Sequence, residues 1–323
     1  MHAKDSTTPA SPIELVLRGS FPGPELEKED VYLSQGWSVA EDETGNILTL
    51  DAKAKAVFEF QPDGRFVRKF GRAGQGPGEF DIPIKILCHR KSGYVLDNGR
   101  RCIQVFNQEG TWERTMKTPS FYRDLAAGAD GTLFAARHMK YGGEWLVDAL
   151  DSEGNILFSF AEPEQRGSIP PGLLNDVRLA TDEQGMIVLA FRTLGELRAY
   201  DRKGVKLRDA QLEGQDIDRE RAYNMRQFAG YTPGGTGYHH IIEAVRCRNG
   251  RTYVMRMLDK GLEIMAFDSD FRAAAVFRYA ADEQVYALDF EVAGDSNSPV
   301  FFVLKNLPEN RVDILAPGKN VRN

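Results

Sequence analysis

The sequence predicts an all-β fold in which six small sheets form a ring. Short β-rich runs recur along all 323 residues, and most of them directly follow a glycine turn. Each run leads into a second strand and a second turn, at a step of about 20 residues. Short strands joined by tight turns at this spacing make a propeller blade rather than a sandwich or an α/β unit. We therefore predict a single-domain, six-bladed β-propeller.

The second strand of each blade is the most visible part of the repeat. These strands are expected at residues 47–50, 94–96, 132–134, 186–189, 252–255 and 300–303. The first five follow a glycine, and the sixth follows a turn-forming stretch at 295–299. An inner strand precedes each of these turns, and two further strands follow. The predicted blades are 37–72, 83–118, 122–163, 176–214, 241–282 and 285–317.

The sixth blade runs out of sequence after its third strand, 311–315. Residues 13–18 can supply the missing outer strand and join the two ends of the chain, which would leave no free sheet edge. We therefore expect one propeller domain over residues 13–317, with an insertion at about 215–240 between the fourth and fifth blades. Residues 1–12 and 318–323 are expected to be flexible tails.

Composition narrows the possible partners. The net charge of −6 argues against nucleic-acid binding, which needs a basic surface. No apolar run reaches the roughly 18 residues of a membrane span. The cysteines Cys88, Cys102 and Cys247 are too few and too scattered for a disulfide framework, and none forms a C-x-x-C pair. We expect a monomer with no nucleic-acid partner and no membrane span.

The first twelve residues are rich in Ser, Thr, Pro and Ala and contain no apolar signal core, so they are not a signal peptide as they stand. They resemble the spacer that remains when a bacterial secretory or lipoprotein signal is removed. This resemblance favours a periplasmic or secreted protein over a cytoplasmic one. The tail of a cytoplasmic protein would have much the same composition, so both locations stay open.

The link after the first blade carries a family resemblance. Residues 70–80 read Phe-Gly-Arg-Ala-Gly-Gln-Gly-Pro-Gly-Glu-Phe, and Pro83 follows at the next inner strand. Then come Gly-Tyr-Val-Leu-Asp-Asn at 93–98 and Ile-Gln-Val-Phe at 103–106. This order resembles the NHL repeat of bacterial six-bladed propellers. The match is close over about 37–118, whereas later blades keep the turns and lose the aspartate. The resemblance implies a propeller and leaves function open.

The glycines of this link could be mistaken for a phosphate-binding loop. Such a loop opens a helix, but Pro77 and Pro83 oppose a helix here. We interpret the segment as an interblade link whose glycines adopt positive φ.

Charged residues recur at the end of the second strand of each blade. They are Asp51, Asp97, Arg137, Arg192, Arg256 and Lys305. The starts of the inner strands open onto the same face and contribute Lys85, Arg123, Asp124, Arg178 and Glu243. One channel mouth would then carry a crescent of cations opposite two aspartates. Either this crescent binds an anion through bidentate arginines, or each arginine pairs with an acid such as Asp124, Asp176 or Glu243.

The insertion at 215–240 offers a second feature of the same rim. Asp216 and Asp218 are expected to cap a short helix, and a flexible stretch follows at 230–238. Tyr231 and Tyr238 would lie at the tip of a lid over the mouth. A decorative loop without a binding role is the alternative interpretation.

Candidates for catalysis are few. His138 and His240 are the candidate bases, and only one of His239 and His240 can face the channel, because adjacent strand residues point in opposite directions. His89 is expected at a turn of the opposite face. We predict no cofactor, but a divalent metal remains an option, with Asp51, Asp97 and Glu243 as weak candidate ligands. No G-x-S-x-G nucleophile elbow is present.

Two functions from different classes fit these features, and the sequence does not decide whether the protein is an enzyme. The first is a binding propeller that holds an anionic small molecule or an acidic peptide or protein segment at its mouth. The second is a lyase or hydrolase acting on an anionic substrate, with His138 or His240 as the base and Arg137, Arg192 and Arg256 as clamps. A histidine within hydrogen-bond reach of the arginines would favour the enzyme.

Overall fold

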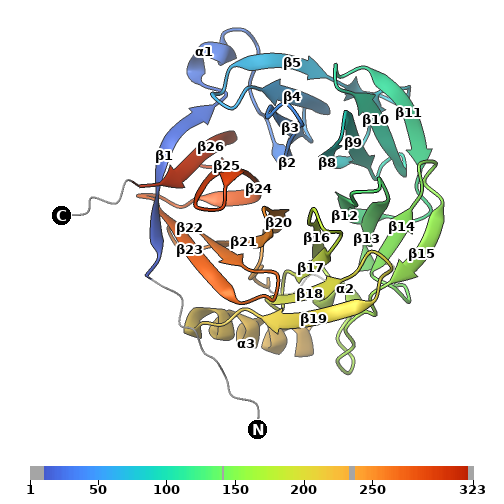
Figure 1. The fold of residues 1–323 in the computed structure, drawn as a ribbon, viewed down its shortest axis with the longest axis vertical. Coiled ribbons are helices and arrows are strands. Elements are labelled where there is room, and N and C mark those ends of the chain that lie inside the picture. The colour runs from blue at the N-terminus through green and yellow to red at the C-terminus, as the bar shows by residue number, and fades with distance from the viewer. Residues whose placement is uncertain (1–10, 140–141, 233–236, 319–323) are drawn as a thin grey trace.

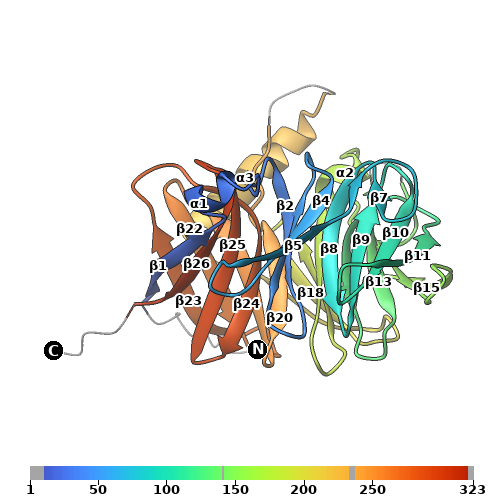
Figure 2. The same cartoon turned by 90° about the horizontal axis from the view of Figure 1, so that it is seen from above.

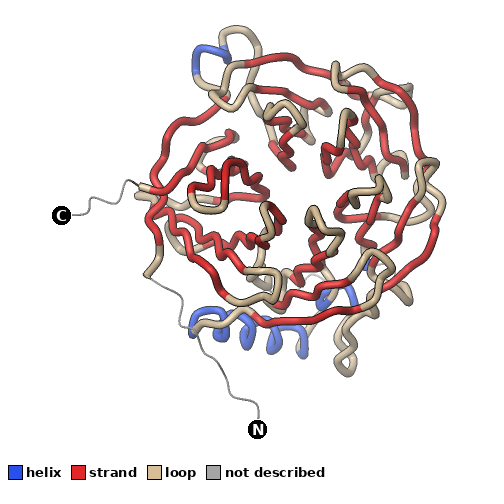
Figure 3. The backbone as a smooth tube through the Cα atoms, in the orientation of Figure 1, coloured by secondary structure: helices blue, strands red, loops and turns tan. Residues whose placement is uncertain are grey.

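Six blades surround a central channel in the computed structural model, which describes residues 11–139, 142–232 and 237–318 (Figure 1). The order of the strands confirms the predicted fold: each blade is an antiparallel sheet of four strands, with its first strand at the channel and its last at the outer edge. Figure 3 shows the inner strands converging on the channel, while α1 and α3 lie at the periphery.

The first three blades follow the chain without interruption. Blade one consists of β2 (Gly36–Glu41), β3 (Ile47–Asp51), β4 (Ala56–Phe60) and β5 (Phe66–Phe70). Blade two consists of β8 (Pro83–His89), β9 (Ser92–Asp97), β10 (Cys102–Asn107) and β11 (Trp112–Lys117). Blade three consists of β12 (Tyr122–Ala127), β13 (Leu133–Arg137), β14 (Val147–Leu150) and β15 (Ile156–Phe160). The short strands β6 (Arg72–Ala73) and β7 (Glu79–Phe80) pair within the glycine-rich link.

The other three blades complete the ring. Blade four consists of β16 (Val177–Thr181), β17 (Ile187–Phe191), β18 (Glu196–Tyr200) and β19 (Lys206–Gln211). Blade five consists of β20 (Ala244–Arg248), β21 (Arg251–Met257), β22 (Gly261–Phe267) and β23 (Ala273–Ala280). Blade six consists of β24 (Tyr286–Asp295), β25 (Ser298–Leu307), β26 (Arg311–Pro317) and the N-terminal strand β1 (Ile13–Phe21).

The three helices define the upper face of the ring. They are α1 (Pro24–Glu27), α2 (Pro171–Leu174) and α3 (Gln215–Ala229), and each lies in a segment that leads to an inner strand. Figure 2 shows all three at the top of the molecule. The inner strands therefore begin at the upper face and end at the lower face. The channel has an upper mouth at the starts of these strands and a lower mouth at their ends.

Strand β1 closes the ring as the sequence predicts. It pairs antiparallel with β26 from Leu15 opposite Pro317 to Phe21 opposite Val312. Its first two residues, Ile13 and Glu14, pair parallel with β23 of blade five. The strand thus joins blades five and six as well as the two ends of the chain, and the outer edge of blade six is paired.

Helix α3 begins differently from the expectation. Gly214 precedes the helix, and neither Asp216 nor Asp218 caps it. Their carboxylates instead contact Arg256 at 2.7 Å and Arg221 at 2.6 Å. Acids in a first helical turn are favourable beside the positive end of the helix dipole, and here they also find cationic partners.

The apolar side of α3 packs onto the propeller. Ile217 and Phe228 are buried in two different clusters of the core, and Met225 packs against the cluster that contains Phe228. Of the predicted lid, Tyr231 and Tyr238 are both exposed, while residues 233–236 between them lie outside the described part of the chain. None of the described helices has the length and apolar character needed to cross a bilayer.

Closure by β1 makes a testable contribution to stability. Leu15 is 2% exposed and packs with Phe277 and Leu315, whereas Leu17 on the same strand is 43% exposed. We expect Leu15→Ala to lower the free energy of unfolding by about 2–4 kcal/mol, because it leaves a cavity at the closing seam. Leu17→Ala should change it by less than about 1 kcal/mol. Urea unfolding of both variants measures this, and equal effects would contradict the role of the seam.

Candidate functional site

The aspartates of the NHL-like motif have a structural role. Asp51 is fully buried and accepts hydrogen bonds from the backbone N–H groups of residues 34, 35, 53 and 54. Asp97 is also fully buried and accepts four such bonds, from residues 81, 82, 99 and 100. Each carboxylate therefore ties the turn after its strand to the link that enters the same blade. With their oxygens bonded in this way, both residues are poor metal ligands.

Three cations of the predicted crescent pair with acids of their own blades, and Arg256 also pairs with an acid of α3. Arg137 makes a bidentate contact with Asp148 on the next strand, at 2.7 and 2.9 Å. Arg256 contacts Asp216 of α3 at 2.7 Å and Glu263 on the next strand at 3.4 Å, and Lys305 pairs with Asp313 on β26. Since these partners lie on more peripheral strands or on α3, the three cations do not converge on the channel mouth. The expectation of one continuous crescent was wrong for these positions.

The remaining cations gather at the upper mouth between blades three, four and five. This upper-mouth cluster consists of Arg123, Asp176, Arg178, Arg192, Glu243 and His240. The side chain of Arg192 lies between two acids: it contacts Asp176 at 2.9 Å and also Glu243. Arg178 and Arg123 approach Asp176 from the side, at 3.5 and 3.9 Å.

Cationic charge exceeds acidic charge in this cluster, since three guanidiniums face two carboxylates. Burial alone would raise the pKa of Asp176, but Arg192, Arg178 and Arg123 outweigh it and hold that pKa well below its usual range. Burial, and then repulsion from Arg192, lowers the pKa of Arg178. Arginine stays protonated in proteins, so Arg178 holds its charge in a largely desolvated place beside two other guanidiniums, and an added anion would stabilise that charge.

A histidine and two tyrosines border the cluster. His240 places Nδ1 3.5 Å from Glu243 and Nε2 3.7 Å from Asp176. Tyr238 packs edge-on against the His240 ring, with 5.6 Å between ring centres. Tyr286, at the start of β24, is 38% exposed. The mouth therefore combines guanidinium groups with partly exposed aromatic surface, which is typical of binding sites.

Lys85 lies deeper in the channel than the predicted position at the mouth. It is the third residue of β8, and its ammonium group contacts Asp124 at 3.1 Å and Asp289 at 3.3 Å inside the channel. Asp289 also accepts bonds from Ser38 at 2.9 Å and Arg246 at 2.6 Å. We call these five residues the central network. Two cations and two aspartates balance one another there, so Lys85 is neutralised within the channel and does not belong to the upper mouth.

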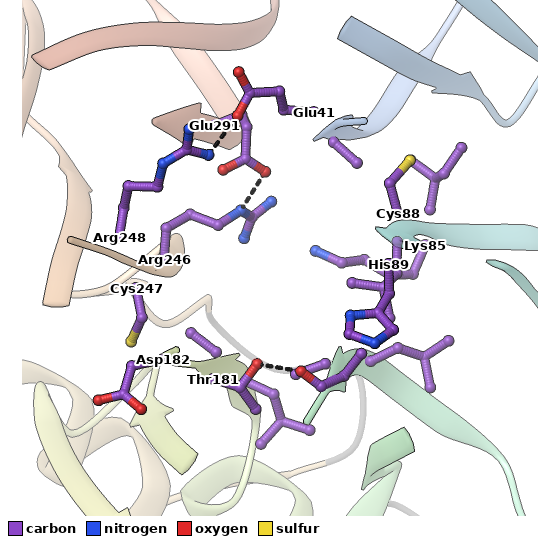
Figure 4. Close-up of a pocket in the computed structure, with 18 of the residues that line it drawn as sticks. Glu41, Lys85, Cys88, His89, Thr181, Asp182, Arg246, Cys247, Arg248 and Glu291 are labelled. Carbon is purple, nitrogen blue, oxygen red and sulfur yellow. Dashed lines mark hydrogen bonds and ion pairs between the residues drawn. The ribbon is translucent and has the colours of Figure 1, made fainter. Parts of the chain in front are cut away.

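The cavity of the channel lies at the lower mouth (Figure 4). Its volume is about 490 Å³, within the range of ligand sites. The polar residues around it are Glu41, Lys85, His89, Thr181, Asp182, Glu183, Arg246, Arg248 and Glu291, and Cys88 and Cys247 also line it. We call this space the lower cavity. No sequence pattern points to this cavity, and of the residues that line it only His89 is predicted to lie at this face.

Some predicted site residues join the upper-mouth cluster and others do not. The structure brings together Arg123, Arg178, Arg192, Glu243, His240 and Tyr238. His138 follows β13 beside Arg137, and Tyr231 lies just beyond α3. Asp176 is predicted only as an ion-pair partner of an arginine, and Tyr286 is not among the predicted site residues. The position of Tyr286 at the start of an inner strand is the signal that could have identified it.

Metal ligands do not group together in the described residues: no three His, Cys, Asp or Glu side chains lie close enough to hold an ion. Of the weak candidates, Asp51 and Asp97 bond backbone amides, and Glu243 bonds Arg192 and His240. The guanidinium of Arg192 thus occupies the space between the two buried acids of the upper mouth. We derive no metal-dependent step from these residues.

The central network gives the protein a specific response to acid. Burial raises the pKa of Asp289, but Arg246 and Lys85 outweigh it and lower the pKa to about 2. The ordinary value is about 3.9, so the unfolded state binds the proton first as pH falls. The contribution of Asp289 is therefore complete above pH 4 and is lost as pH falls through about 2. Its magnitude is on the order of 2 kcal/mol.

Asp289→Asn tests this linkage. At pH 7 we expect the free energy of unfolding to fall by about 3–5 kcal/mol, because Lys85 and Arg246 lose a buried counter-charge. The difference from the wild type should shrink between pH 4 and pH 2, as the native aspartate becomes protonated. Urea unfolding over this pH range measures it, with the exposed Asp209→Asn as control. A difference that stays constant over the range would contradict the assignment.

The comparisons with known proteins agree on the fold. A family model described as a six-bladed beta-propeller matches residues 25–171. Solved structures match over most of the chain at low identity. A putative exported protein from Bacteroides fragilis is 13% identical, with 94% of this chain and 95% of that chain covered and a TM-score of 0.61. No curated protein sequence matches the chain.

Two other similar structures are of enzymes. A gluconolactonase from Xanthomonas campestris is 12% identical, with 89% and 87% of the two chains covered and a TM-score of 0.56. Virginiamycin B lyase from Staphylococcus aureus is 9% identical, with 88% and 86% covered and a TM-score of 0.54. Likeness at this level of identity is informative about the fold alone, and none of the matches identifies the NHL repeat specifically. Strand order, family model and solved structures together establish that the chain is a six-bladed β-propeller.

Proposed function

We propose that this protein is a ligand-binding propeller whose upper mouth holds a small anionic molecule. One observation carries the proposal: three guanidiniums surround a single buried carboxylate, Asp176, at the open end of the channel. Two of them, Arg123 and Arg178, keep side chains that are 37% and 21% exposed. Both can therefore turn donors toward a ligand in the mouth.

The ion pairs of the cluster divide its arginines into two kinds. Arg192 is nearly buried and joins two acids, so its charge is neutralised within the protein. Arg123 and Arg178 share Asp176 with it and approach at longer distances. A carboxylate, phosphate or sulfate group would offset their charge through bidentate hydrogen bonds. The aromatic edges of Tyr238 and Tyr286 would border the rest of such a ligand.

Anion titration of Arg123→Ala and Arg178→Ala tests this site. We expect the wild type to bind succinate, sulfate or phosphate, and each variant to bind roughly tenfold more weakly, because a charge-assisted hydrogen bond to an anion is worth about 1.5–3 kcal/mol. Calorimetric titration measures the affinity. Arg114→Ala, which removes an exposed charge from the outer strand β11, is the matched control. Arg192 is unsuitable, since its removal would leave two buried acids unpaired.

Three results are informative here. Binding that weakens in both mouth variants but not in the control supports the proposal. Binding that is equal in all variants places the anion elsewhere. If an acidic peptide binds and succinate, sulfate and phosphate do not, the ligand is a protein segment and not a small molecule.

A second candidate function is an enzyme, a lyase or hydrolase acting on an anionic substrate at the same mouth. The observation that favours it is the position of His240, with each ring nitrogen within 3.7 Å of a carboxylate of the cluster. A histidine oriented by a carboxylate is a common general base, and nearby guanidiniums can stabilise negative charge that develops during a reaction. The lactonase and the lyase among the similar structures show that propellers of this fold can carry hydrolase or lyase chemistry.

His240→Gln separates the two functions. With 6-phospho-D-glucono-1,5-lactone, a lactone that carries a negative charge, as substrate, we expect an enzyme to lose at least about 100-fold in kcat, since general base catalysis contributes about 10²–10⁴. Affinity for succinate should change less than threefold, because the arginines remain. Hydrolysis is followed by pH-stat titration, with His138→Gln as the matched variant. If the wild type does not hydrolyse the lactone, or if wild type and His240→Gln hydrolyse it at equal rates, the enzyme hypothesis is contradicted and binding is the function that remains.

A further inference from the structure

The lower cavity is separate from the proposed anion site. The central network lies between them, with Lys85 and Arg246 lining the cavity on one side and paired to buried aspartates on the other. Figure 4 shows the ammonium of Lys85 and the ring of His89 on the β8 side of the space. Three alanines, Ala40, Ala126 and Ala180, come from three different inner strands and line the wall. Their small side chains leave the space open.

Each lysine and arginine that lines the lower cavity is already ion-paired with a carboxylate. Arg248 pairs with Glu41 at the rim. Arg246 contacts Glu291 at 3.2 Å and Asp289 at 2.6 Å. Lys85 is likewise held by the two aspartates of the central network. The lower cavity therefore offers an anion no unneutralised positive charge, in contrast to the upper mouth.

Acidic charge, however, is in excess there. Asp182 and Glu183 have no ion-pair partner in the part of the chain that the structure describes. One oxygen of Asp182 accepts the N–H groups of residues 184 and 186, and Glu183 accepts the N–H of residue 249. Six carboxylates surround the cavity and the central network above it, against three cations. They are Glu41, Asp124, Asp182, Glu183, Asp289 and Glu291.

The pKa values of nearby groups reflect the same negative field. Burial, and then the carboxylates of Asp42, Glu291, Glu59 and Glu41, raises the pKa of the Cys88 thiol far above its usual range. Burial, with Asp182 and Glu183 adding to it, raises the pKa of Cys247 to about 12. Two thiols on different inner strands thus experience excess negative charge from opposite sides of the lower cavity.

The size of the space determines which kind of cation fits. Figure 4 places Glu41 and Glu291 on one side of the cavity and Asp182 on the other. Among the residues described, no three potential ligands are close enough to share a metal ion. The acids surround about 490 Å³, which matches a small organic molecule rather than an ion. The alanine wall suits the aliphatic part of such a molecule.

We propose that the lower cavity is a second binding site, for a small organic cation that carries a primary ammonium group. The ammonium donates to the unpaired acids at the Asp182 edge, and its aliphatic chain lies along the alanine wall. A second ammonium, where the ligand has one, is positioned toward Glu41 and Glu291. The channel then has two mouths of opposite preference, separated by a neutral network.

Three probes with the same four-carbon chain test the charge preference. They are 1,4-diaminobutane, 1,4-butanediol and succinate, titrated into the full chain by calorimetry. We expect the diamine to bind and to be displaced by salt, and butanediol to bind at least roughly tenfold more weakly because it lacks the charge. Succinate probes the upper mouth in the same experiment, so failure of one site is distinguishable from failure of the other.

The double variant Asp182→Asn/Glu183→Gln locates the site. The Asn side chain keeps a carbonyl oxygen for the turn that Asp182 closes, so the fold should be retained, and circular dichroism checks this. Asp201→Asn is the matched control, because Asp201 closes the same type of turn, accepting from residues 203 and 205, away from the cavity lining. We expect roughly tenfold weaker diamine binding in the double variant and unchanged binding in the control.

The mouth variants give an independent control. Arg123→Ala and Arg178→Ala should bind the diamine as the wild type does, since both arginines lie beyond the central network. The proposal is overturned if the wild type does not bind the diamine, or if the double variant binds it equally well. It is also overturned if butanediol binds as tightly as the diamine, because charge would then not select the ligand.

Discussion

The central network joins all six blades, because its two aspartates bond groups on every inner strand. Asp289 of β24 accepts from Ser38 of β2, Lys85 of β8 and Arg246 of β20. Asp124 of β12 pairs with Lys85 and accepts the backbone N–H of Leu179 on β16 at 2.9 Å. Breaking a buried pair by removing one member leaves an uncompensated charge and costs about 3–5 kcal/mol. The arrangement of the six inner strands, and therefore both mouths, depends on these contacts being complete.

Because the network is neutral and fills the middle of the channel, the two mouths can differ in charge. Above it, Arg123 and Arg178 share one carboxylate with Arg192, and cations are in excess. Below it, Asp182 and Glu183 have no cationic partner among the described residues, and acids are in excess. A chain with a net charge of −6 thus keeps a cationic patch at one end of its channel. Local ion pairing, and not the net charge of the chain, decides the excess charge at each mouth.

Sequence patterns predicted the blades well, because glycine turns and β-rich runs depend on local chemistry. The six blades and the closing strand lie within a few residues of their predicted positions. The ion pairs of the charged residues at the strand ends were harder to predict, since the position of a residue in a strand does not determine which partner its long side chain reaches. Arg137 and Lys305 pair with acids on neighbouring strands of their own blades, and only tertiary register reveals Asp148 and Asp313 as those partners. The lower cavity depends on small residues from three separate blades, and no single segment of the sequence displays it.

Ion pairs and hydrogen bonds hold the insertion between blades four and five against the propeller, beside the upper mouth. Arg256 of blade five contacts Asp216 of α3, and Arg221 of α3 donates to the backbone oxygens of residues 194 and 212 in blade four. Asn224, also on α3, is buried and bonds both the N–H and the C=O of His239. His239 immediately precedes His240, whose ring contacts both acids of the upper-mouth cluster. Residues 238–240 border the upper mouth, and α3 fixes their position. A ligand bound there would contact a segment that the helix holds in place. The helix has a physical reason to be present: it holds one wall of the mouth at the junction of two blades.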